Sequence, residues 1–272
     1  MTTTPLTDTP YDSGVPASAR DFSVEARVVI VTGAAQGIGR ELARQFAAAG
    51  AFAVVADLDI DKADAVVKEI HDAGGVGLAV KVNVADEASV VAMVDTVIQE
   101  WGRVDVLINN ASIFATIEKG PFDQIPLEQW EKVLNVNVTG SYLCVRAVAA
   151  HMRAAGFGRI INISSDSVTR GVGNYLHYVT SKSALIGMTN SLARELGGHG
   201  ITVNCVRPGM VTTEVERNQT AEARARAASQ QCIPRNMFPT DLVGVMFFLA
   251  TPASAFITGQ TIACDGGYTH SS

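Results

Sequence analysis

Hydrophobic and polar positions alternate along this chain with two different periods. From residue 27 onward, short apolar runs rich in Val, Ile and Ala are each followed by a longer segment whose apolar residues recur every three to four positions. The first pattern is typical of a strand buried on both faces, and the second of a helix with one apolar face. The sequence therefore predicts a repeated strand and helix unit.

This alternation continues through most of the chain. The expected strands are the runs VVIVTG, AFAVVAD, VGLAVKVNV, VDVLINN, GRIINISS and ITVNCVRPG. The longest helices are expected near residues 127–155 and 176–198. Because strands that are apolar throughout need helices on both faces of their sheet, the predicted fold class is α/β, a doubly wound Rossmann-type domain with a parallel sheet.

The same pattern sets the expected domain organisation. No linker rich in Pro, Gly or Ser interrupts the alternation, so we expect one catalytic domain over residues 23–272. Residues 1–22 have neither a basic start nor an apolar core, which favours a flexible tail over a secretory signal. The irregular stretch 210–239 follows a strand end, where ligands of such sheets bind, and we expect a substrate lid there. An ordinary pair of surface helices agrees equally well with its composition.

Composition and charge narrow the classes of partner. The formal net charge of the 272 residues is −6, so we expect no binding to nucleic acid or to an anionic membrane surface. No apolar run approaches the roughly 20 residues of a membrane-spanning helix, and we expect a cytoplasmic protein. Dispersed histidines and cysteines predict reduced thiols and no metal site, the cysteines being Cys144, Cys205, Cys232 and Cys264.

A candidate nucleotide site follows the first expected strand. Residues 32–39 read TGAAQGIG, and a helix begins within them. Glycines allow a tight turn and a close backbone approach, and a helix N-terminus favours the negative charge of a pyrophosphate. The spacing differs from the commoner GxGxxG, so a glycine-rich turn without a ligand would explain the same residues.

Asp57 turns that motif into a specific prediction. It ends the second expected strand, 24 residues after Gly33, and an acid that binds the adenosine ribose is expected about 20 residues on. Its carboxylate can accept hydrogen bonds from both ribose hydroxyls, but it would repel a 2′-phosphate. No Lys or Arg stands at 34–36 or 58–60 to offset that repulsion, so the sequence predicts NAD rather than NADP.

A second candidate site is the segment YLHYVTSK, residues 175–182. A tyrosine with its ordinary pKa of about 10 needs a nearby cation before it can take a proton from an alcohol at neutral pH. Tyr178 has Lys182 one helical turn along the same face, and Tyr175 lies two turns from that lysine. His177 has a better matched pKa, but the helix turns it about 100° away from Tyr178, so we expect a bystander.

In order along the chain, these motifs resemble those of the short-chain dehydrogenase/reductase family, from about residue 24 to 268. The matching segments are TGAAQGIG at 32–39, NNAS at 109–112, Asn137 in NVNVTG, Ser165 in NISSDS, Tyr178 and Lys182 in YVTSK, RPGMVTT at 207–213 and TGQTIACDGG at 258–267. The resemblance implies a seven-stranded parallel sheet, a nicotinamide cofactor, hydride transfer at a hydroxyl-bearing carbon and, commonly, a homotetramer.

The resemblance also implies catalytic roles. Tyr178, 13 residues after Ser165, would be the acid/base, and Lys182 the cation that tunes it. Ser165 would hydrogen-bond the substrate oxygen. Asn137 would hold a water that links Lys182 to solvent, although a purely structural amide explains its position in a helix equally well. The cofactor-binding residues would be Gly33, Gln36, Gly37, Ile38, Gly39, Asp57, Leu58, Asn83, Val84, Asn110, Ala111, Tyr178, Lys182, Pro208, Gly209, Val211 and Thr213.

Two residues depart from the family's pattern. Asn83 stands where the family usually has Asp, and its amide oxygen can still accept a hydrogen bond from the adenine amino group. Ser112 replaces the usual Gly beside the cofactor and adds a hydroxymethyl group there. The expected substrate-pocket residues are Ser112, Asp166, Tyr175 and Met210.

Several functions agree with these residues. The leading prediction is an NAD-dependent dehydrogenase of a cyclic or aryl secondary alcohol, with apolar walls from Ile113, Phe114, Val168, Met210, Met237 and Phe238. Asp166, Arg170 and Glu214 would equally suit a sugar or polyol. A 3-oxoacyl-thioester reductase is a further alternative, which Asp57 disfavours because such reductases usually use NADPH. A catalytically idle NAD-binding protein is disfavoured by the complete catalytic set.

Overall fold

A computed structural model of the chain describes residues 21–114, 116–215 and 220–270. The predicted tail therefore lies outside the described residues, apart from its last two. Asp21 accepts a hydrogen bond at its main-chain oxygen from the Ala253 N–H at 3.0 Å. The ring of Phe22 stacks on Phe248 with 6.3 Å between ring centres, so these two residues lie against the C-terminal part of the fold.

Seven parallel strands form one sheet in the order β3-β2-β1-β4-β5-β6-β7. They are β1 (Val28–Thr32), β2 (Phe52–Asp57), β3 (Val76–Lys81), β4 (Val106–Asn109), β5 (Gly158–Ile163), β6 (Ile201–Pro208) and β7 (Thr261–Cys264). The first six lie inside the predicted apolar runs, and β7 lies inside the motif TGQTIACDGG. The predicted doubly wound α/β fold is therefore confirmed.

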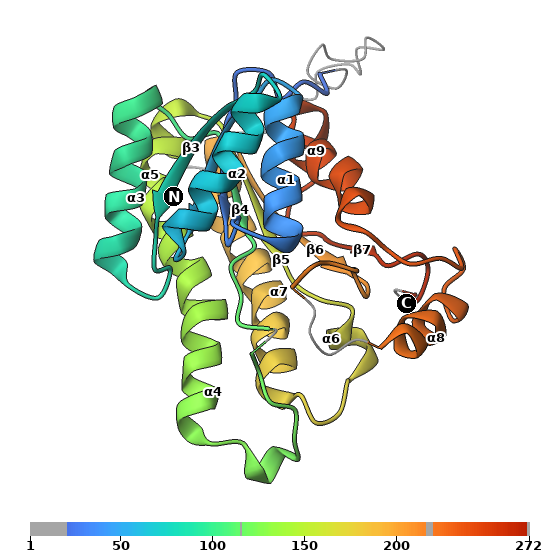
Figure 1. The fold of residues 1–272 in the computed structure, drawn as a ribbon. Helices are drawn as coiled ribbons and strands as arrows, with labels where there is room; N and C mark the ends of the chain where they lie inside the picture. Colours follow the sequence, from blue (N-terminus) through green and yellow to red (C-terminus); the bar gives the residue numbers. More distant parts are fainter. Residues whose placement is uncertain (1–20, 115, 216–219, 271–272) are drawn as a thin grey trace, which may run out of the picture.

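Helices cover both faces of the sheet (Figure 1). One face packs against α1 (Gly37–Ala48), α2 (Ile60–Asp72) and α9 (Val243–Ala250). The other face packs against α3 (Glu87–Trp101), α5 (Gly140–Ala155) and α7 (Leu176–Leu196). The remaining α-helices of the described residues are α4 (Leu127–Leu134), α6 (Ser167–Arg170) and α8 (Ala221–Ser229).

Strand β1 shows why the strands are apolar at every position. Val29 and Val31 pack in one core cluster, whereas Val28 and Ile30 pack in the other. Successive side chains of a strand point to opposite faces, and both faces here are covered by helices. Each full burial of such a side chain contributes about 1.5 to 3 kcal/mol, so the sheet is the main source of stability.

The helix expected near 127–155 is continuous and contains one wider turn. A π-helical segment, Asn135–Thr139, joins α4 to α5, and the fully buried Asn137 lies within it. The Asn137 amide donates to Ser181 Oγ at 3.0 Å and accepts from the Ile113 N–H at 2.8 Å. The wider turn therefore places a polar side chain between α7 and the segment after β4.

The same helix, Leu127–Ala155, is long and apolar enough to cross a membrane by length and composition, which the sequence did not predict. Half of its most apolar window is buried inside the protein. Its α5 portion packs on α3 and on strands β4 and β5. Core helices of globular proteins meet the same length and composition criteria, and this burial is what a core helix requires.

Candidate active site

A cavity of about 830 Å³ lies at the carboxyl ends of the strands. The strand order reverses between β1 and β4, which is where open α/β sheets bind their ligands. Most residues predicted from the sequence line this cavity, namely Gly33, Gln36, Gly37, Ile38, Asp57, Leu58, Asn83, Val84, Asn110, Ala111, Ser112, Ser165, Asp166, Tyr175, Tyr178, Lys182, Pro208, Gly209, Met210, Val211 and Thr213. Gly39 and Asn137 do not line it.

The glycine turn after β1 requires its glycines for different reasons. Gly33 has a φ of 64°, and a Cβ at this position would lie 2.7 Å from Ala111 Cα. A Cβ on Gly39 would lie 2.3 Å from the Gly33 main-chain oxygen. Gly39 therefore lets α1 pack closely against the turn, and its expected contact with a cofactor stays a prediction.

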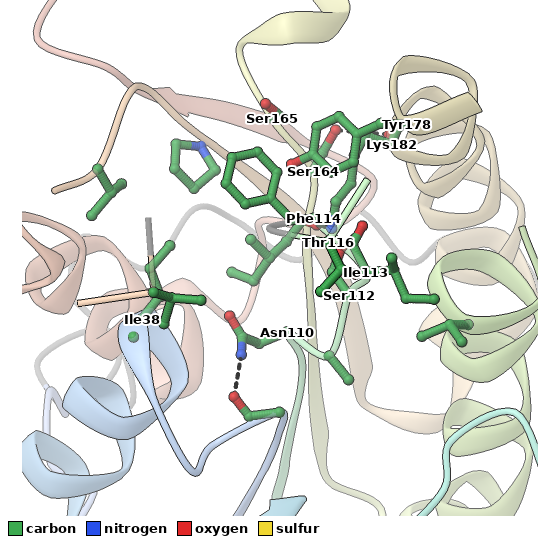
Figure 2. Close-up of a pocket in the computed structure, with 18 of the residues that line it drawn as sticks. Ile38, Asn110, Ser112, Ile113, Phe114, Thr116, Ser164, Ser165, Tyr178 and Lys182 are labelled. Carbon is green, nitrogen blue, oxygen red and sulfur yellow. Dashed lines mark hydrogen bonds between the residues drawn. The ribbon is translucent and has the colours of Figure 1, made fainter. Parts of the chain in front are cut away.

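Asn110 connects this turn to β4 (Figure 2). Its Nδ2 donates to the main-chain oxygens of Thr32 and Gly33, each at 2.9 Å. The Thr32 hydroxyl accepts from the Asn110 and Ala111 N–H groups, each at 3.1 Å. The site prediction did not include Thr32. A threonine at the end of an otherwise apolar strand could have indicated a polar contact at this strand end.

Carboxylates stand around the N-terminus of α1. The Gly37 N–H donates to Glu214 Oε1 at 3.0 Å, so an anion already occupies the position that the helix N-terminus favours. Asp57 Oδ2 accepts from the Ala35 N–H at 2.9 Å, and Oδ1 accepts from the Asp59 N–H at 3.0 Å. These bonds hold the Asp57 carboxylate at the cavity edge beside the turn.

Asn83 uses its side chain locally. Its Oδ1 accepts from the Ala85 N–H at 3.1 Å, and its own N–H donates to Ser89 Oγ at 2.9 Å. An amide oxygen has two lone pairs, so one remains for a ligand. Asn83 lines the cavity, and its expected contact with adenine stays a prediction.

Tyr178 and Lys182 lie one turn apart on α7, and both are buried. The Lys182 ammonium lies 5.8 Å from the centre of the Tyr178 ring and donates to the Ile163 main-chain oxygen at 2.8 Å. Burial lowers the pKa of Lys182 to about 8. An ammonium that has lost its water in this way is stabilised by a negative group nearby, such as a tyrosinate.

The two adjacent serines after β5 have different surroundings. Ser164 is buried, and its hydroxyl donates to the Lys182 main-chain oxygen at 2.8 Å, so it anchors α7. Ser165 lines the cavity, and its Oγ accepts from the Ser167 N–H at 3.2 Å. Figure 2 shows both serines in the same view as Tyr178 and Lys182. Ser164 also lines the cavity, so the two serines differ in their hydrogen bonds and are not separated onto different faces as alternation along a strand predicts.

An apolar wall stands beside Tyr178. The Tyr175 ring stacks on the Tyr178 ring at 4.6 Å, and the Phe114 ring lies 5.3 Å from Tyr178, both measured between ring centres. Ile117 and Val133 are buried in the same cluster. The Tyr175 hydroxyl donates to the Phe114 main-chain oxygen at 3.2 Å. Tyr175 is thus part of the cavity wall and holds the segment after β4 in place.

Asp166 and Arg170 largely neutralise each other. Arg170 Nη1 lies 2.9 Å from Asp166 Oδ2, and the Arg170 guanidinium also stacks over the Tyr268 ring at 4.5 Å. Burial raises the pKa of Asp166, and its hydrogen bond with Arg170 opposes that rise. The pair leaves little net charge at this side of the cavity.

The expected lid is described in two parts, 210–215 and 220–239. Met210, Val211, Thr213 and Val215 line the cavity, and a parallel bridge joins Val211 to Met237. Three of the apolar residues proposed as walls do not line the cavity, namely Val168, Met237 and Phe238. Met237 is buried under the bridge instead, and Phe238 is 47 % exposed.

His177 lies off the cavity and is fully buried. Neither ring nitrogen has a hydrogen-bond partner within the described part of the chain, and its ring meets Tyr175 edge-on at 5.9 Å. Burial lowers the pKa of His177. Its side chain therefore belongs to the interior behind the site.

We expect His177 to weaken the fold at acid pH. Because the unfolded histidine, with a pKa near 6.5, takes up a proton more readily than the folded one, stability falls as the pH drops below about 6.5. In His177→Leu the loss of thermal stability between about pH 7.5 and about pH 5.5 should be smaller than in the wild type. His199→Gln, at an exposed position, should behave as the wild type. An unchanged loss in His177→Leu would contradict this reading.

Comparisons with known proteins agree with this geometry. The family described as Enoyl-(Acyl carrier protein) reductase matches residues 33–269. The cis-4-hydroxycyclohexanecarboxylate dehydrogenase of Sinomonas cyclohexanicum is 38% identical over 89% of this chain and 96% of its own. A 3-oxoacyl-[acyl-carrier-protein] reductase of Synechocystis sp. is 39% identical over 90% and 98%.

A solved structure is similarly close. It belongs to a candidate NAD(P)-dependent gluconate 5-dehydrogenase from Beutenbergia cavernae, crystallised with NADP bound at low occupancy. It is 36% identical in sequence, covers 91% of this chain and 98% of its own, and superimposes with a TM-score of 0.84. The likeness thus extends over nearly the whole chain in sequence and in fold.

Proposed function

The chain belongs to the short-chain dehydrogenase/reductase family, whose members are oxidoreductases that act on hydroxyl or keto groups, and from this premise we propose a specific reaction. The proposed reaction interconverts a cyclic or aryl secondary alcohol and its ketone with NAD(H), and Tyr178 is the acid/base. The observation that carries it is the buried pair of Tyr178 and Lys182 beside an apolar wall in the cavity.

The residues present fit a nicotinamide dinucleotide. The glycine turn lines the cavity at Gly33 and Gly37, where its backbone could approach a pyrophosphate. The N-terminus of α1 supplies a dipole that favours an anion, and a pyrophosphate there would take the place of Glu214 at the Gly37 N–H. Asp57 stands at the edge where a ribose would lie. When bound, the nicotinamide supplies the hydride acceptor or donor.

The chain's own residues handle the proton. Tyr178 takes the proton of the substrate hydroxyl at its phenolic oxygen during oxidation and returns it during reduction. The Lys182 ammonium stabilises the negative charge that Tyr178 carries before it takes the proton and after it returns it. Ser165, at the cavity wall, hydrogen-bonds the same substrate oxygen and orients it. The Asn137 side chain accepts from the Ile113 N–H and donates to Ser181 on α7. It thereby joins the segment after β4 to the helix that carries Tyr178 and Lys182.

The apolar wall supports the cyclic or aryl substrate over a polyol. Phe114, Tyr175 and Tyr178 present ring faces and edges to the cavity. Of the three charged residues considered for a polyol, Asp166 and Arg170 are paired with each other, and Glu214 accepts from the Gly37 N–H. A turnover screen tests the proposal, with NAD and a panel of cyclic, aryl and open-chain secondary alcohols and polyols, each in both enantiomers. Turnover confined to polyols would reject it.

For the cofactor, we propose a preference for NAD that rests on Asp57. Replacing Asp57 with Ala removes the carboxylate that would repel a 2′-phosphate and that would bind the ribose hydroxyls. We expect the ratio of kcat/KM for NAD to that for NADP to fall about tenfold or more, since a charge-assisted hydrogen bond contributes about 1.5 to 3 kcal/mol. Asp61→Ala, in the exposed first turn of α2, is the matched control. An unchanged ratio in Asp57→Ala would show that Asp57 does not determine the preference between NAD and NADP.

We also propose a cytoplasmic homotetramer, with residues 210–239 forming a lid over the substrate. The tetramer is supported by the frequent oligomerisation of the family and by exposed aromatic side chains such as Tyr142 on α5, which is 45 % exposed. Light scattering after size-exclusion chromatography measures the assembly directly. A monomer at assay concentrations would reject the tetramer.

A further inference from the structure

The substrate side of the cavity carries an excess of positive charge. Lys119 and Lys132 both line the cavity there, in addition to the paired Asp166 and Arg170. Neither lysine has an acidic side chain within ion-pair distance over residues 21–114, 116–215 and 220–270. Asp57 also lines the cavity, but it belongs to the cofactor turn. The Lys119 and Lys132 ammonium groups thus lack an anionic partner among these described residues.

Lys119 is held close to the catalytic tyrosine. Its ammonium lies 4.8 Å from the centre of the Tyr175 ring, and that ring stacks on Tyr178 at 4.6 Å. A cation over an aromatic face is attracted by it, so this contact keeps the ammonium one ring away from Tyr178.

The backbone around Lys119 is fixed as well. The Gly120 N–H donates to the Asn174 main-chain oxygen at 3.0 Å, which ties this segment to the residue just before Tyr175. On the other side, Ile117 is buried and its N–H donates to the Phe114 main-chain oxygen at 3.3 Å. The backbone that carries Lys119 is therefore anchored on both sides, and its exposed side chain reaches the cavity wall at Tyr175.

An apolar surface separates this cation from the reacting position. Phe114 and Tyr175 form it, with Ile117 and Val133 packed in the same cluster. A substrate with its hydroxyl at Tyr178 and a hydrocarbon ring against Phe114 would present a group on the far side of that ring to Lys119. An anionic oxygen there would form a charge-assisted hydrogen bond, which is about twice as strong as a neutral one.

We propose that Lys119, assisted by Lys132, binds a carboxylate of the substrate. The substrate class is then a hydroxy acid or keto acid with a cyclic, apolar body, the oxidisable hydroxyl at one end and the carboxylate at the other. The placement of the substrate hydroxyl at Tyr178 rests on the proposed function. The contact between the carboxylate and Lys119 requires only that the substrate binds, without turnover. Lys119 acts here as a specificity-determining residue and takes no part in the proton transfer.

Calorimetric titration tests this contact without turnover. The probes are cyclohexanecarboxylate and its uncharged counterpart cyclohexanecarboxamide, titrated into the full-length enzyme with and without NADH. We expect the wild type to bind the carboxylate at least about tenfold more tightly than the amide, because a hydrogen bond to a charged group contributes about that factor or more. In Lys119→Met the two affinities should agree within about twofold.

Two further variants control for folding and for general charge effects. Lys119→Arg keeps the positive charge and should retain the preference for the carboxylate. Lys68→Met removes an exposed lysine on α2 that pairs with Asp72, and should leave both affinities unchanged. Equal affinities in the wild type, no binding of either probe, or an unchanged preference in Lys119→Met would each overturn the proposal.

The same titration separates this proposal from the proposed function. Tyr178→Phe should keep the preference for the carboxylate, since that contact does not use the Tyr178 hydroxyl. A retained preference in an enzyme that oxidises no alcohol would reject the proposed reaction alone. Turnover of neutral alcohols without any preference for the carboxylate would reject the Lys119 contact alone.

Discussion

Replacing Tyr178 with Phe is expected to lower kcat for alcohol oxidation about a thousandfold, which is within the range attributed to a positioned acid/base. The ring and its stacking on Tyr175 at 4.6 Å are kept, and only the hydroxyl that accepts the proton is lost. The affinity for NAD should stay within about twofold, because the change removes no charge from the cofactor turn. Steady-state NADH formation and NAD titration measure the two effects.

Tyr175→Phe is the matched control for this variant. It removes the hydroxyl of the neighbouring tyrosine, which donates to the Phe114 main-chain oxygen rather than to the reacting position. We expect kcat to stay within about threefold of the wild type, since one neutral hydrogen bond contributes about 1 kcal/mol. Two results would show that Tyr178 is not the acid/base. One is a Tyr178→Phe enzyme that keeps a tenth or more of wild-type kcat, and the other is a Tyr175→Phe enzyme whose kcat falls as much as that of Tyr178→Phe.

The second large effect is expected at Lys182. Replacing it with Met should lower kcat/KM about a hundredfold near neutral pH, because the cation that favours ionised Tyr178 is gone. The loss should shrink as the pH rises, since the base can then ionise without help. Profiles of kcat/KM between about pH 6 and about pH 10 should show the acidic limb displaced to higher pH in Lys182→Met. A uniform loss at every pH would mean that Lys182 only positions the helix.

Lys182→Met should also make the protein more stable. Burial lowers the Lys182 pKa from 10.5 to about 8, so the folded state releases this proton before the unfolded state does. The cost of burying the charge is therefore fully present below about pH 8 and is relieved as the pH rises toward the unfolded pKa. At 1.36 kcal/mol per pKa unit that cost is about 3 kcal/mol, part of which the bond to the Ile163 oxygen offsets.

Urea unfolding at about pH 7 and about pH 10 measures the free energy of unfolding of both proteins. A more stable but less active Lys182→Met would be an example of a trade-off between stability and activity. Lys182→Met should exceed the wild type in stability at the lower pH, and the difference should narrow at the higher pH. A less stable Lys182→Met at neutral pH would show that packing of the lysine outweighs the cost of its charge.

The strands were predictable from the sequence because both faces of the sheet are covered. In β1, β4 and β6 every side chain is buried, so the apolar run coincides with the element. Strand β7 has four residues that are only partly buried, and hydrophobicity alone gave no signal for it. The π-helical turn at Asn137 adds one residue to one turn, which is too small a change to alter the periodicity of a helix of this length.

The residues at the glycine turn and at Asp57 could be predicted to line one cavity because a motif fixes the backbone there. The turn at Gly33 and the acid at Asp57 are set by local geometry at two strand ends. Contacts between distant segments were not predictable in the same way. Glu214 reaches the Gly37 N–H across 177 positions of sequence. A carboxylate at that turn depends on how the segment after β6 returns over α1.

The predictions from the sequence were least accurate for the residues that line the substrate side of the cavity. Val168 is apolar and close in sequence to Ser165, and Met237 and Phe238 are apolar and lie in the expected lid, yet none of the three lines the cavity. Lys119 has no motif around it, and its aromatic neighbour Tyr175 is distant in the chain. Its position depends on the bond between Gly120 and Asn174, which joins two loops. Substrate recognition here is a property of loop packing, which composition and periodicity do not encode.

Isotope transfer tests the central claim most directly. A panel of cyclic and aryl secondary alcohols, deuterated at the carbinol carbon, is incubated with NAD and either the wild type or Tyr178→Phe, and the mass of the NADH formed is measured. The account predicts deuterated NADH with the wild type and, within the same time, almost none with Tyr178→Phe. NADH without deuterium, no NADH from any alcohol of the panel, or equal deuterated NADH from both proteins would contradict it.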